Sequence, residues 1–365
     1  MQGKILFKGR KKTVKNAIFA PETRFHRRIM EKKYITYVFL CLLLLGCSQR
    51  QGSVSGSQLV FEQGSYPNTT FWQGKYYFTM QLTQADSIVL YAASDPLQLA
   101  TGERRTVWHV DSMQHIWSPE LHRVNDKWYV YFEADDGNTD NHQLYVLESD
   151  SDDPMRGSFQ LKGAIKTNDE WNFGLHPTTI VVRGQQYLLW SGWEHRRMET
   201  ETQCIYIARM KNPWTLDSGR VLLSKPELEW ERQWINPSSD RSNYPIFVNE
   251  NPEAFITPNN QYVCVCYSAS GIWTVYHALG MLYARADADL LRLQSWTKVQ
   301  EPLFTSGDAN RVYGTSNISL VPSADGSGQW LFYEANHRVG RQWHRSIFAK
   351  PMSWDEKGLP LFGKP

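Results

Sequence analysis

The stretch Ile116-Trp117-Ser118-Pro119-Glu120-Leu121-His122 and the Lys127-Trp128-Tyr129 that follows it carry the pattern from which the fold class follows. Apolar and aromatic residues stand on both sides of a Pro, a polar turn comes next, and aromatic residues resume after it. Asp126 marks the turn eight positions after Ser118, and Tyr129 lies three positions further on. Such runs, bounded by turn residues, predict two antiparallel strands joined by a short turn.

The same spacing recurs along the chain. In every regular copy the turn residue lies eight positions after the residue before Pro, and a Tyr lies eleven positions after it. The regular copies begin at Tyr66-Pro67, Ser118-Pro119, His176-Pro177 and Asn251-Pro252, and a fifth unit without Pro runs through Ser316-Asn317 and Asp325-Gly326 to Trp330. Units roughly 50 to 75 residues apart, each with several short strands, are typical of propeller blades. The sequence therefore predicts an all-β chain with one five-bladed β-propeller over residues 58–365.

One residue of each unit is expected at the centre of this propeller. If each unit opens with the innermost strand of its blade, these residues converge on one end of the axis. They are Tyr66, Ser118, His176, Asn251 and Ser316. Together they would surround a pocket about the size of one sugar ring.

Composition supports a large folded core. Hydrophobic residues make up 41% of the chain and aromatic residues 13%, with 15 Trp, enough to fill a core and leave rings for a binding surface. The formal net charge is only +2, and much of the basic excess lies within the first 33 residues. Past that point nothing indicates a nucleic-acid partner.

The N-terminal region predicts a secreted, lipid-anchored protein. Basic residues precede the apolar run 34–45, which is too short for a spanning helix and is typical of a secretion signal that starts at Met30. The run ends in Leu44-Leu45-Gly46-Cys47, which resembles a bacterial lipobox. We expect residues 1–46 to be a leader absent from the mature protein, Cys47 to carry the lipid, and 47–57 to be a flexible tether. The location is then the bacterial cell envelope, at the periplasmic or surface face of the outer membrane.

Three cysteines remain outside the leader and the lipobox. Cys264 and Cys266 lie two positions apart in a strand-like run, so both side chains point to the same face, which is poor geometry for a disulfide. With Cys204, they are interpreted as buried hydrophobic residues.

From Leu59 to the C-terminus the sequence resembles glycoside hydrolase family 43, most closely its arabinofuranosidase-type members. The matching segments are residues 116–122 with 127–129, 187–193 (Tyr-Leu-Leu-Trp-Ser-Gly-Trp), 248–253 (Val-Asn-Glu-Asn-Pro-Glu), 267–270 (Tyr-Ser-Ala-Ser), 279–280 and 295–298. The resemblance implies a propeller that hydrolyses arabinose- or xylose-containing glycans with inversion. It also implies an Asp base, a second Asp that orients the acid and raises its pKa, and a Glu acid.

Only one member of that catalytic set is kept. Glu250 stands at the position of the acid, but the base position is Tyr66 and the orienting position is His176. The family's Gly-His-Asn, whose His helps to hold a central metal, reads Thr315-Ser316-Asn317, and its Tyr-His-Ala reads Tyr333-Glu334-Ala335. A central calcium ion is implied by resemblance alone, and because its His position is Ser316 we assign no cofactor and no metal ligand.

Each of these residues has more than one interpretation. Tyr66 either plugs the pocket, acts as a weak base, or acts as a nucleophile helped by a carboxylate, as in sialidases. His176 either serves as acid or base or hydrogen-bonds a sugar hydroxyl. Glu250 is either the surviving acid or a group that only binds the ligand. Substitutes for the lost carboxylates are Glu120, Glu253, Glu334 and, in a long insertion beside Trp234, Asp240.

The expected substrate-binding residues lie beside the axial positions. Aromatic rings stack on the apolar faces of sugars, although most propeller tryptophans belong to the core. The set comprises Trp117, Trp171, Phe173, Trp193, Ser316 and Glu334.

Two functions remain open from the sequence. One is an altered glycosidase in which Glu250 is the acid and His176, or a water held by Tyr66 and His176, supplies the nucleophile. The other is an inactive, glycan-binding lipoprotein of a polysaccharide-utilisation system. In both, the partner is an oligo- or polysaccharide, and the membrane is reached only through the N-terminal lipid.

Overall fold

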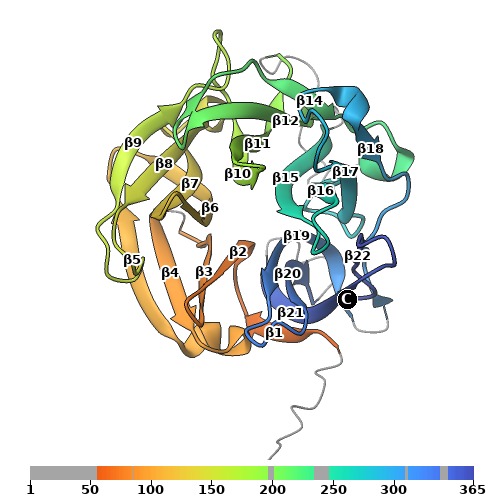
Figure 1. The fold of residues 1–365 in the computed structure, drawn as a ribbon, viewed down its shortest axis with the longest axis horizontal. Helices are drawn as coiled ribbons and strands as arrows, with labels where there is room; N and C mark the ends of the chain where they lie inside the picture. Colours follow the sequence, from red (N-terminus) through yellow and green to blue (C-terminus); the bar gives the residue numbers. More distant parts are fainter. Residues whose placement is uncertain (1–55, 85, 196–200, 234–245, 309–310, 338–343) are drawn as a thin grey trace, which may run out of the picture. The chain divides into compact units, whose positions relative to one another are not determined.

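The computed structural model describes residues 56–365, apart from residues 85, 196–200, 234–245, 309–310 and 338–343. The lipobox with Cys47 and the insertion residues Trp234 and Asp240 lie outside this part. Among the residues described, strands dominate and form sheets around a common axis, with β2, β6, β10, β15 and β19 nearest the centre (Figure 1). The predicted five-bladed propeller, with each unit opening on its innermost strand, is confirmed.

Within each blade the strands pair antiparallel and follow one another outward from the axis; parallel pairing of residues 201–203 with 246–248 also joins blades 3 and 4. The first is β2 (Ser65–Trp72), β3 (Lys75–Gln81), β4 (Ser87–Ala93) and β5 (Glu103–His109); the second is β6 (Gln114–Val124), β7 (Lys127–Asp135), β8 (Gln143–Ser149) and β9 (Gln160–Ile165). The third is β10 (Leu175–Val182), β11 (Gln185–Trp193) and β12 (Glu201–Asn212) with β13 (Thr215–Leu216) and β14 (Val221–Ser224); the fourth is β15 (Ile246–Ile256), β16 (Tyr262–Ala269), β17 (Ala278–Arg285) and β18 (Trp296–Lys298). The fifth is β19 (Tyr313–Pro322), β20 (Gln329–Asn336) and β21 (Arg345–Trp354) with β1 (Gln58–Phe61) and β22 (Pro360–Leu361). Short 3₁₀ helices occur at η1 (Pro96–Thr101), η2 (Thr139–Asn141), η3 (Glu229–Arg232) and η4 (Leu293–Ser295).

Strand β1 closes the ring, because the first strand of the propeller completes its last blade. Gln58 pairs with Ala349 and Leu59 with Phe348, both in β21. This pairing joins the two ends of the propeller, and β1 itself becomes the outermost strand of the last blade.

The X-Pro repeat proves to be a bulge in every innermost strand. Its first residue has a positive φ: 54° at Tyr66, 42° at Ser118, 51° at His176, 48° at Asn251 and 42° at Asn317. Residues other than glycine rarely adopt this conformation, so the surrounding structure must hold each one in place. The fifth member is Asn317 and not Ser316, which corrects the predicted axial position by one residue.

Side chains of the preceding blade hold these residues. The backbone N–H of Tyr66 donates to Glu334 Oε2 (2.7 Å) and that of His176 to Glu133 Oε2 (3.0 Å). The remaining two observed bonds run from Asn251 N–H to Ser191 Oγ and from Asn317 N–H to Ser268 Oγ, both at 2.9 Å. A buried N–H without a partner is costly, so each acceptor stabilises the bulge beside it. We call Glu133, Ser191, Ser268 and Glu334 the seat residues.

Large apolar side chains fill the space between neighbouring blades. The buried rings of Tyr77 in blade 1 and Trp128 in blade 2 have centroids 5.5 Å apart. Cys264 and Cys266 are free thiols in the cluster between blades 4 and 5, and Cys204 is one in the cluster between blades 2 and 3. Their interpretation as buried hydrophobic residues is confirmed.

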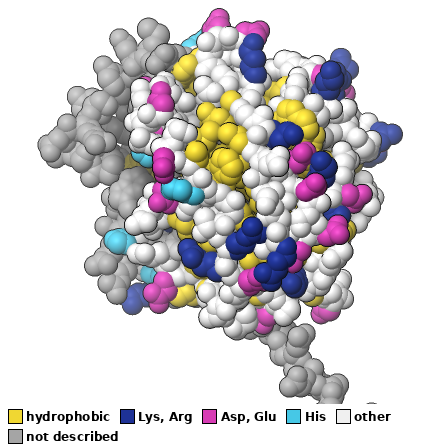
Figure 2. All heavy atoms as spheres, turned by 90° about the vertical axis from the view of Figure 1, so that its left-hand side faces the viewer, with side chains coloured by type: hydrophobic (Ala, Val, Ile, Leu, Met, Phe, Trp, Pro, Cys, Tyr) yellow, Lys and Arg dark blue, Asp and Glu magenta, His cyan; other side chains and the backbone are white. Residues whose placement is uncertain are grey.

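The outer surface contributes little to this stability. On the face shown in Figure 2, basic and acidic side chains are interspersed, with hydrophobic side chains between them. Pairs such as Lys127 with Glu148 (3.3 Å) and Arg209 with Asp217 (2.7 Å) are partly exposed and contribute at most about 1 kcal/mol each. Within the described ranges, none of the helices has the length and apolar character needed to cross a membrane.

Candidate active site

The rings of Tyr66 and His176 stack at the centre of the propeller. Their centroids are 4.9 Å apart and their planes 22° from parallel. Burial raises the pKa of Tyr66 well above its usual value, and the nearby Glu250, Glu334 and Glu133 raise it further. The phenol therefore stays neutral at physiological pH, which argues against Tyr66 as base or as nucleophile.

His176 is held as a neutral imidazole. The residue is only 4% exposed, and its Nδ1 lies 3.2 Å from Ser191 Oγ. Burial lowers the pKa of His176 to about 3, and the nearby His142 and His277 lower it further. His176 is therefore a hydrogen-bonding group without charge near neutral pH.

Glu250 has the properties that a proton donor needs. It pairs with Ser268 in the ladder between β15 and β16 and is 6% exposed. Burial raises the pKa of Glu250 to about 8, the negative charge of Glu334 adds to this, and Arg345 opposes it. A carboxyl group with this pKa keeps its proton at neutral pH.

Glu133 is a site residue that the sequence reasoning missed. It lies in β7, opposite Trp117 in the ladder, and is fully buried. Burial raises the pKa of Glu133 to about 8, while the His176 N–H bond lowers it. The only signal in the sequence is an isolated acid within a run of apolar residues, Tyr129 to Ala134.

A second missed residue, Arg345, occupies the fifth blade's side of the axis. Its Nε lies 2.5 Å from Glu334 Oε1, and its Nη2 donates to Ser316 Oγ (3.0 Å) and to the carbonyl oxygen of Gly314 (2.6 Å). Glu334 also accepts from Asn317 Nδ2 at 2.8 Å. The structure thus places the predicted binding residues Ser316 and Glu334 in a fully buried network with protein partners.

This arrangement does not fit the central metal ion that the resemblance implies. Ser316 stands where the metal-holding His is expected, and its hydroxyl faces the guanidinium cation of Arg345. Across the described ranges, no three His, Cys, Asp or Glu residues come together in a way that could hold a metal ion. We therefore derive no step through a metal.

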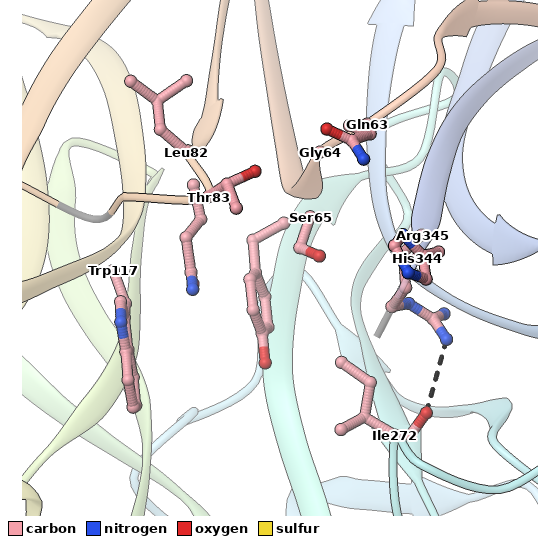
Figure 3. A pocket seen from close by; sticks show the side chains of 11 residues that line it. Gln63, Gly64, Ser65, Leu82, Thr83, Trp117, Ile272, His344 and Arg345 are labelled. Carbon is pink, nitrogen blue, oxygen red and sulfur yellow. Dashed lines mark hydrogen bonds between the residues drawn. The ribbon is translucent and has the colours of Figure 1, made fainter. Parts of the chain in front are cut away.

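A cavity of about 480 Å³ opens beside this centre. Trp117 forms one side, and Ile272, His344 and Arg345 lie opposite, where Arg345 donates to the Ile272 carbonyl (Figure 3). Tyr66 also lines it. The volume falls within the range of small-ligand sites. Trp117, predicted to bind substrate, is therefore placed at an accessible wall.

The other predicted aromatic residues form a separate cluster. Ring centroids of Phe173 and Trp193 are 4.3 Å apart and those of Trp171 and Phe173 are 4.7 Å apart, with the rings nearly parallel. None of the three is among the described residues that line the cavity. Phe173 is 3% and Trp193 8% exposed, so their surface is largely taken by this cluster.

Glu120 and Glu253 lie two residues beyond the axial positions. Glu120 contacts His122 Nε2 at 2.8 Å, and Glu253 accepts from the backbone N–H of Leu320 at 3.2 Å. The Glu253 bond links blade 4 to blade 5, and the Glu120 contact stays within β6; both suit a supporting role. Asp240, the remaining substitute considered, lies outside the described residues.

Comparison with known proteins assigns the propeller and its central carboxyl groups to a family. The model of glycosyl hydrolases family 43 matches residues 62–360. The chain belongs to this family.

Relatives carry related names. An extracellular exo-α-(1→5)-L-arabinofuranosidase of Streptomyces avermitilis is 35% identical over 80% of this chain and 60% of its own length. α-L-Arabinofuranosidase B of Pyricularia oryzae is 30% identical over 87% of this chain and 65% of its own length. The crystal structure of an α-L-arabinofuranosidase from Lactobacillus brevis, 30% identical, superposes with a TM-score of 0.76 and covers 87% of this chain and 98% of that one. The chain thus spans somewhat under two thirds of the first two relatives' lengths.

Proposed function

We propose that this protein is an exo-acting glycosidase that removes terminal arabinofuranosyl or xylosyl residues from plant-type glycans. The family and the names of the relatives support the substrate class. The observation that carries the proposal is Glu250, which is buried at the family's acid position with its pKa raised to about 8. Such a group donates a proton to the leaving glycosidic oxygen at neutral pH.

The cavity accommodates the sugar that is released. Trp117 offers an aromatic face for the apolar side of a sugar ring, and Arg345, whose N–H groups bond protein oxygens, adds positive charge to the opposite wall. Tyr66, held against His176, closes the inner end, so only a terminal sugar enters. This supports removal of single sugars from chain ends.

A second candidate is a protein of the same family that binds glycans without cleaving them. It is favoured by the stack of Tyr66 on His176, which replaces both family Asp residues with groups that are uncharged at neutral pH. Each acid–base group contributes about 10²–10⁴-fold to the rate, so loss of the base without replacement would leave little activity.

The test compares wild-type protein with Glu250→Gln on aryl glycosides of arabinofuranose, xylose and galactose. We expect turnover of at least one substrate by the wild type and a large loss in the variant. Equal rates for the two proteins would refute the glycosidase. Saturable glycan binding without turnover, lost in Trp117→Ala, would establish the second candidate.

We also propose that the mature protein is anchored in the bacterial cell envelope, at the outer membrane, through a lipid on Cys47. The apolar run 34–45 and the lipobox-like Leu44-Leu45-Gly46-Cys47 support this, and the extracellular Streptomyces relatives support secretion. In cells fed radiolabelled palmitate, we expect label in the wild type and none in Cys47→Ala. Equal labelling would overturn the anchor.

A further inference from the structure

The four seat residues perform one structural task with two kinds of side chain. Ser191 and Ser268 accept the N–H of the next blade's axial residue at 2.9 Å through a hydroxyl. Glu133 and Glu334 accept the same kind of bond through a carboxyl group. Because a hydroxyl suffices for the bond, the acid at the other two seats needs a further reason.

Burying a carboxyl group is costly unless both of its oxygens have partners. Glu334 and Glu133 each use one oxygen to accept the N–H bond, and within the described part of the chain the other oxygen has a hydrogen-bond partner only in Glu334. Glu334 Oε1 is paired with Arg345 and Asn317. Glu133 Oε1 has no hydrogen-bond partner among the described residues and lies 3.9 Å from His176 Nε2. A fully buried polar atom without a partner requires a water, an ion or a ligand group to satisfy it.

A second unsatisfied polar atom belongs to the same part of the axis. Ser118, 2% exposed at the neighbouring axial position, has a hydroxyl that makes no hydrogen bond of good geometry within the described ranges but lies close enough to Glu133 to lower the pKa of that carboxyl group. Ser118 directly follows Trp117, the ladder partner of Glu133 and a wall of the cavity. The free oxygen of Glu133, the hydroxyl of Ser118 and the imidazole of His176 form a polar niche behind that wall.

We propose that Glu133 replaces the missing catalytic base and that its free oxygen, with Ser118 and His176, holds the attacking water. The proposal rests on the glycosidase function given above. In the step, the water oxygen bonds to the anomeric carbon while its proton passes to Glu133. The bond from that carbon to the leaving oxygen breaks, and this oxygen takes the proton of Glu250. The net change is addition of one water across the glycosidic bond, with one proton moved from Glu250 to Glu133.

The electrostatics of the site suit such a pair. Glu133 and Glu250 interact as like charges, and burial disfavours ionisation of both. Each carboxyl group keeps its proton at neutral pH, so Glu133 becomes available as a base only as the pH rises toward about 8, where the like charges let the pair hold one proton between them. Other groups facing it are Glu120, Glu334, Arg345, His176 and Tyr66.

Two substitutions separate the base from the seat. Glu133→Ser copies the seats of blades 3 and 4, so it keeps an acceptor for the His176 N–H and removes the carboxyl group. Glu133→Gln keeps both the size and an acceptor oxygen. We expect kcat/KM of each to fall by about 10²–10⁴-fold on the substrate that wild type cleaves best, with thermal unfolding still cooperative.

Added azide distinguishes a catalytic base from a residue that only supports the fold, because azide can replace the lost function of a base but cannot repair a damaged structure. We expect azide to accelerate Glu133→Ser, whose shorter side chain leaves room for the anion, to yield a glycosyl azide of inverted configuration, and to leave wild type unchanged. If Glu250→Gln is inactive while Glu133→Ser keeps activity within a few fold of wild type, Glu133 is not the base and the glycosidase stands. A wild type without turnover on any substrate overturns both.

Discussion

Replacing Glu250 with Gln is expected to stabilise the protein, and increasingly so as the pH rises. The pKa of Glu250 is raised from 4.5 to about 8 by burial and by Glu334. Between these two values the folded protein binds a proton that the unfolded chain has released, so the free energy of unfolding falls by about 1.4 kcal/mol for each pH unit. A glutamine, neutral at every pH, has no such dependence.

The size of the effect follows from the pH. At pH 4.5 the wild-type carboxyl group is protonated and the two proteins should be alike. The difference in the free energy of unfolding should reach about 3 kcal/mol at pH 7 and about 5 kcal/mol at pH 8, as an upper bound. Shared protons among Glu250, Glu334 and Glu133 spread this change over a wider pH range without changing its sign.

Urea unfolding at several pH values between 5 and 8 measures this difference directly. The control is Glu62→Gln, which removes a carboxylate on an exposed side chain and should give a flat difference. If the Glu250→Gln difference is also flat, Glu250 is not held protonated by its surroundings, and the argument for it as acid fails.

Three further results are expected. Arg345→Met should destabilise the fold by about 3–5 kcal/mol in urea unfolding, because it leaves the buried Glu334 without its cation; a loss below about 1 kcal/mol contradicts the pairing. Cleavage of an unactivated arabinosyl glycan should decline above about pH 8, where Glu250 loses its proton, and also toward acid pH, where Glu133 keeps its proton; a maximum of kcat/KM near pH 5 would contradict this. Trp117→Ala should weaken binding of the glycan by about 1–3 kcal/mol in calorimetry with thermal stability nearly unchanged, and unaltered affinity would exclude Trp117 from the binding wall.

Repeat spacing was enough to predict the architecture, because each blade begins with the same bulge. The residue before Pro needs a positive φ, and the Pro that follows has no N–H to pair. The fifth unit lacks the Pro, so nothing in its sequence fixes the register, and the predicted position fell on Ser316 instead of Asn317. Tyr66 and His176 were found through their place in the repeat, and Glu250 through the resemblance to the family.

Glu133 and Arg345 could not be found in this way. Glu133 lies in the second strand of its blade and Arg345 in the third, where alternation shows which face a side chain occupies but no motif marks function. Their importance comes from contacts between distant segments, Glu133 with His176 and Arg345 with Ile272, and such contacts have no local sequence signature. The aromatic cluster of Trp171, Phe173 and Trp193 shows the opposite error, because these residues were predicted to bind substrate. Residue type and position beside the axis did not reveal that the rings pack on one another.

The closure of the ring by β1 also determines how the propeller responds to force. Any pull transmitted from the residues before Gln58 enters the fold through this four-residue strand, which is held by its ladder with β21. If the hydrogen bonds of that ladder break, blade 5 loses its outermost strand and the two ends of the ring are no longer joined by it. The blades that carry Glu133, His176 and Glu250 keep their own strand pairings. Strand β1 is therefore the mechanical latch of the molecule, separate from its chemistry.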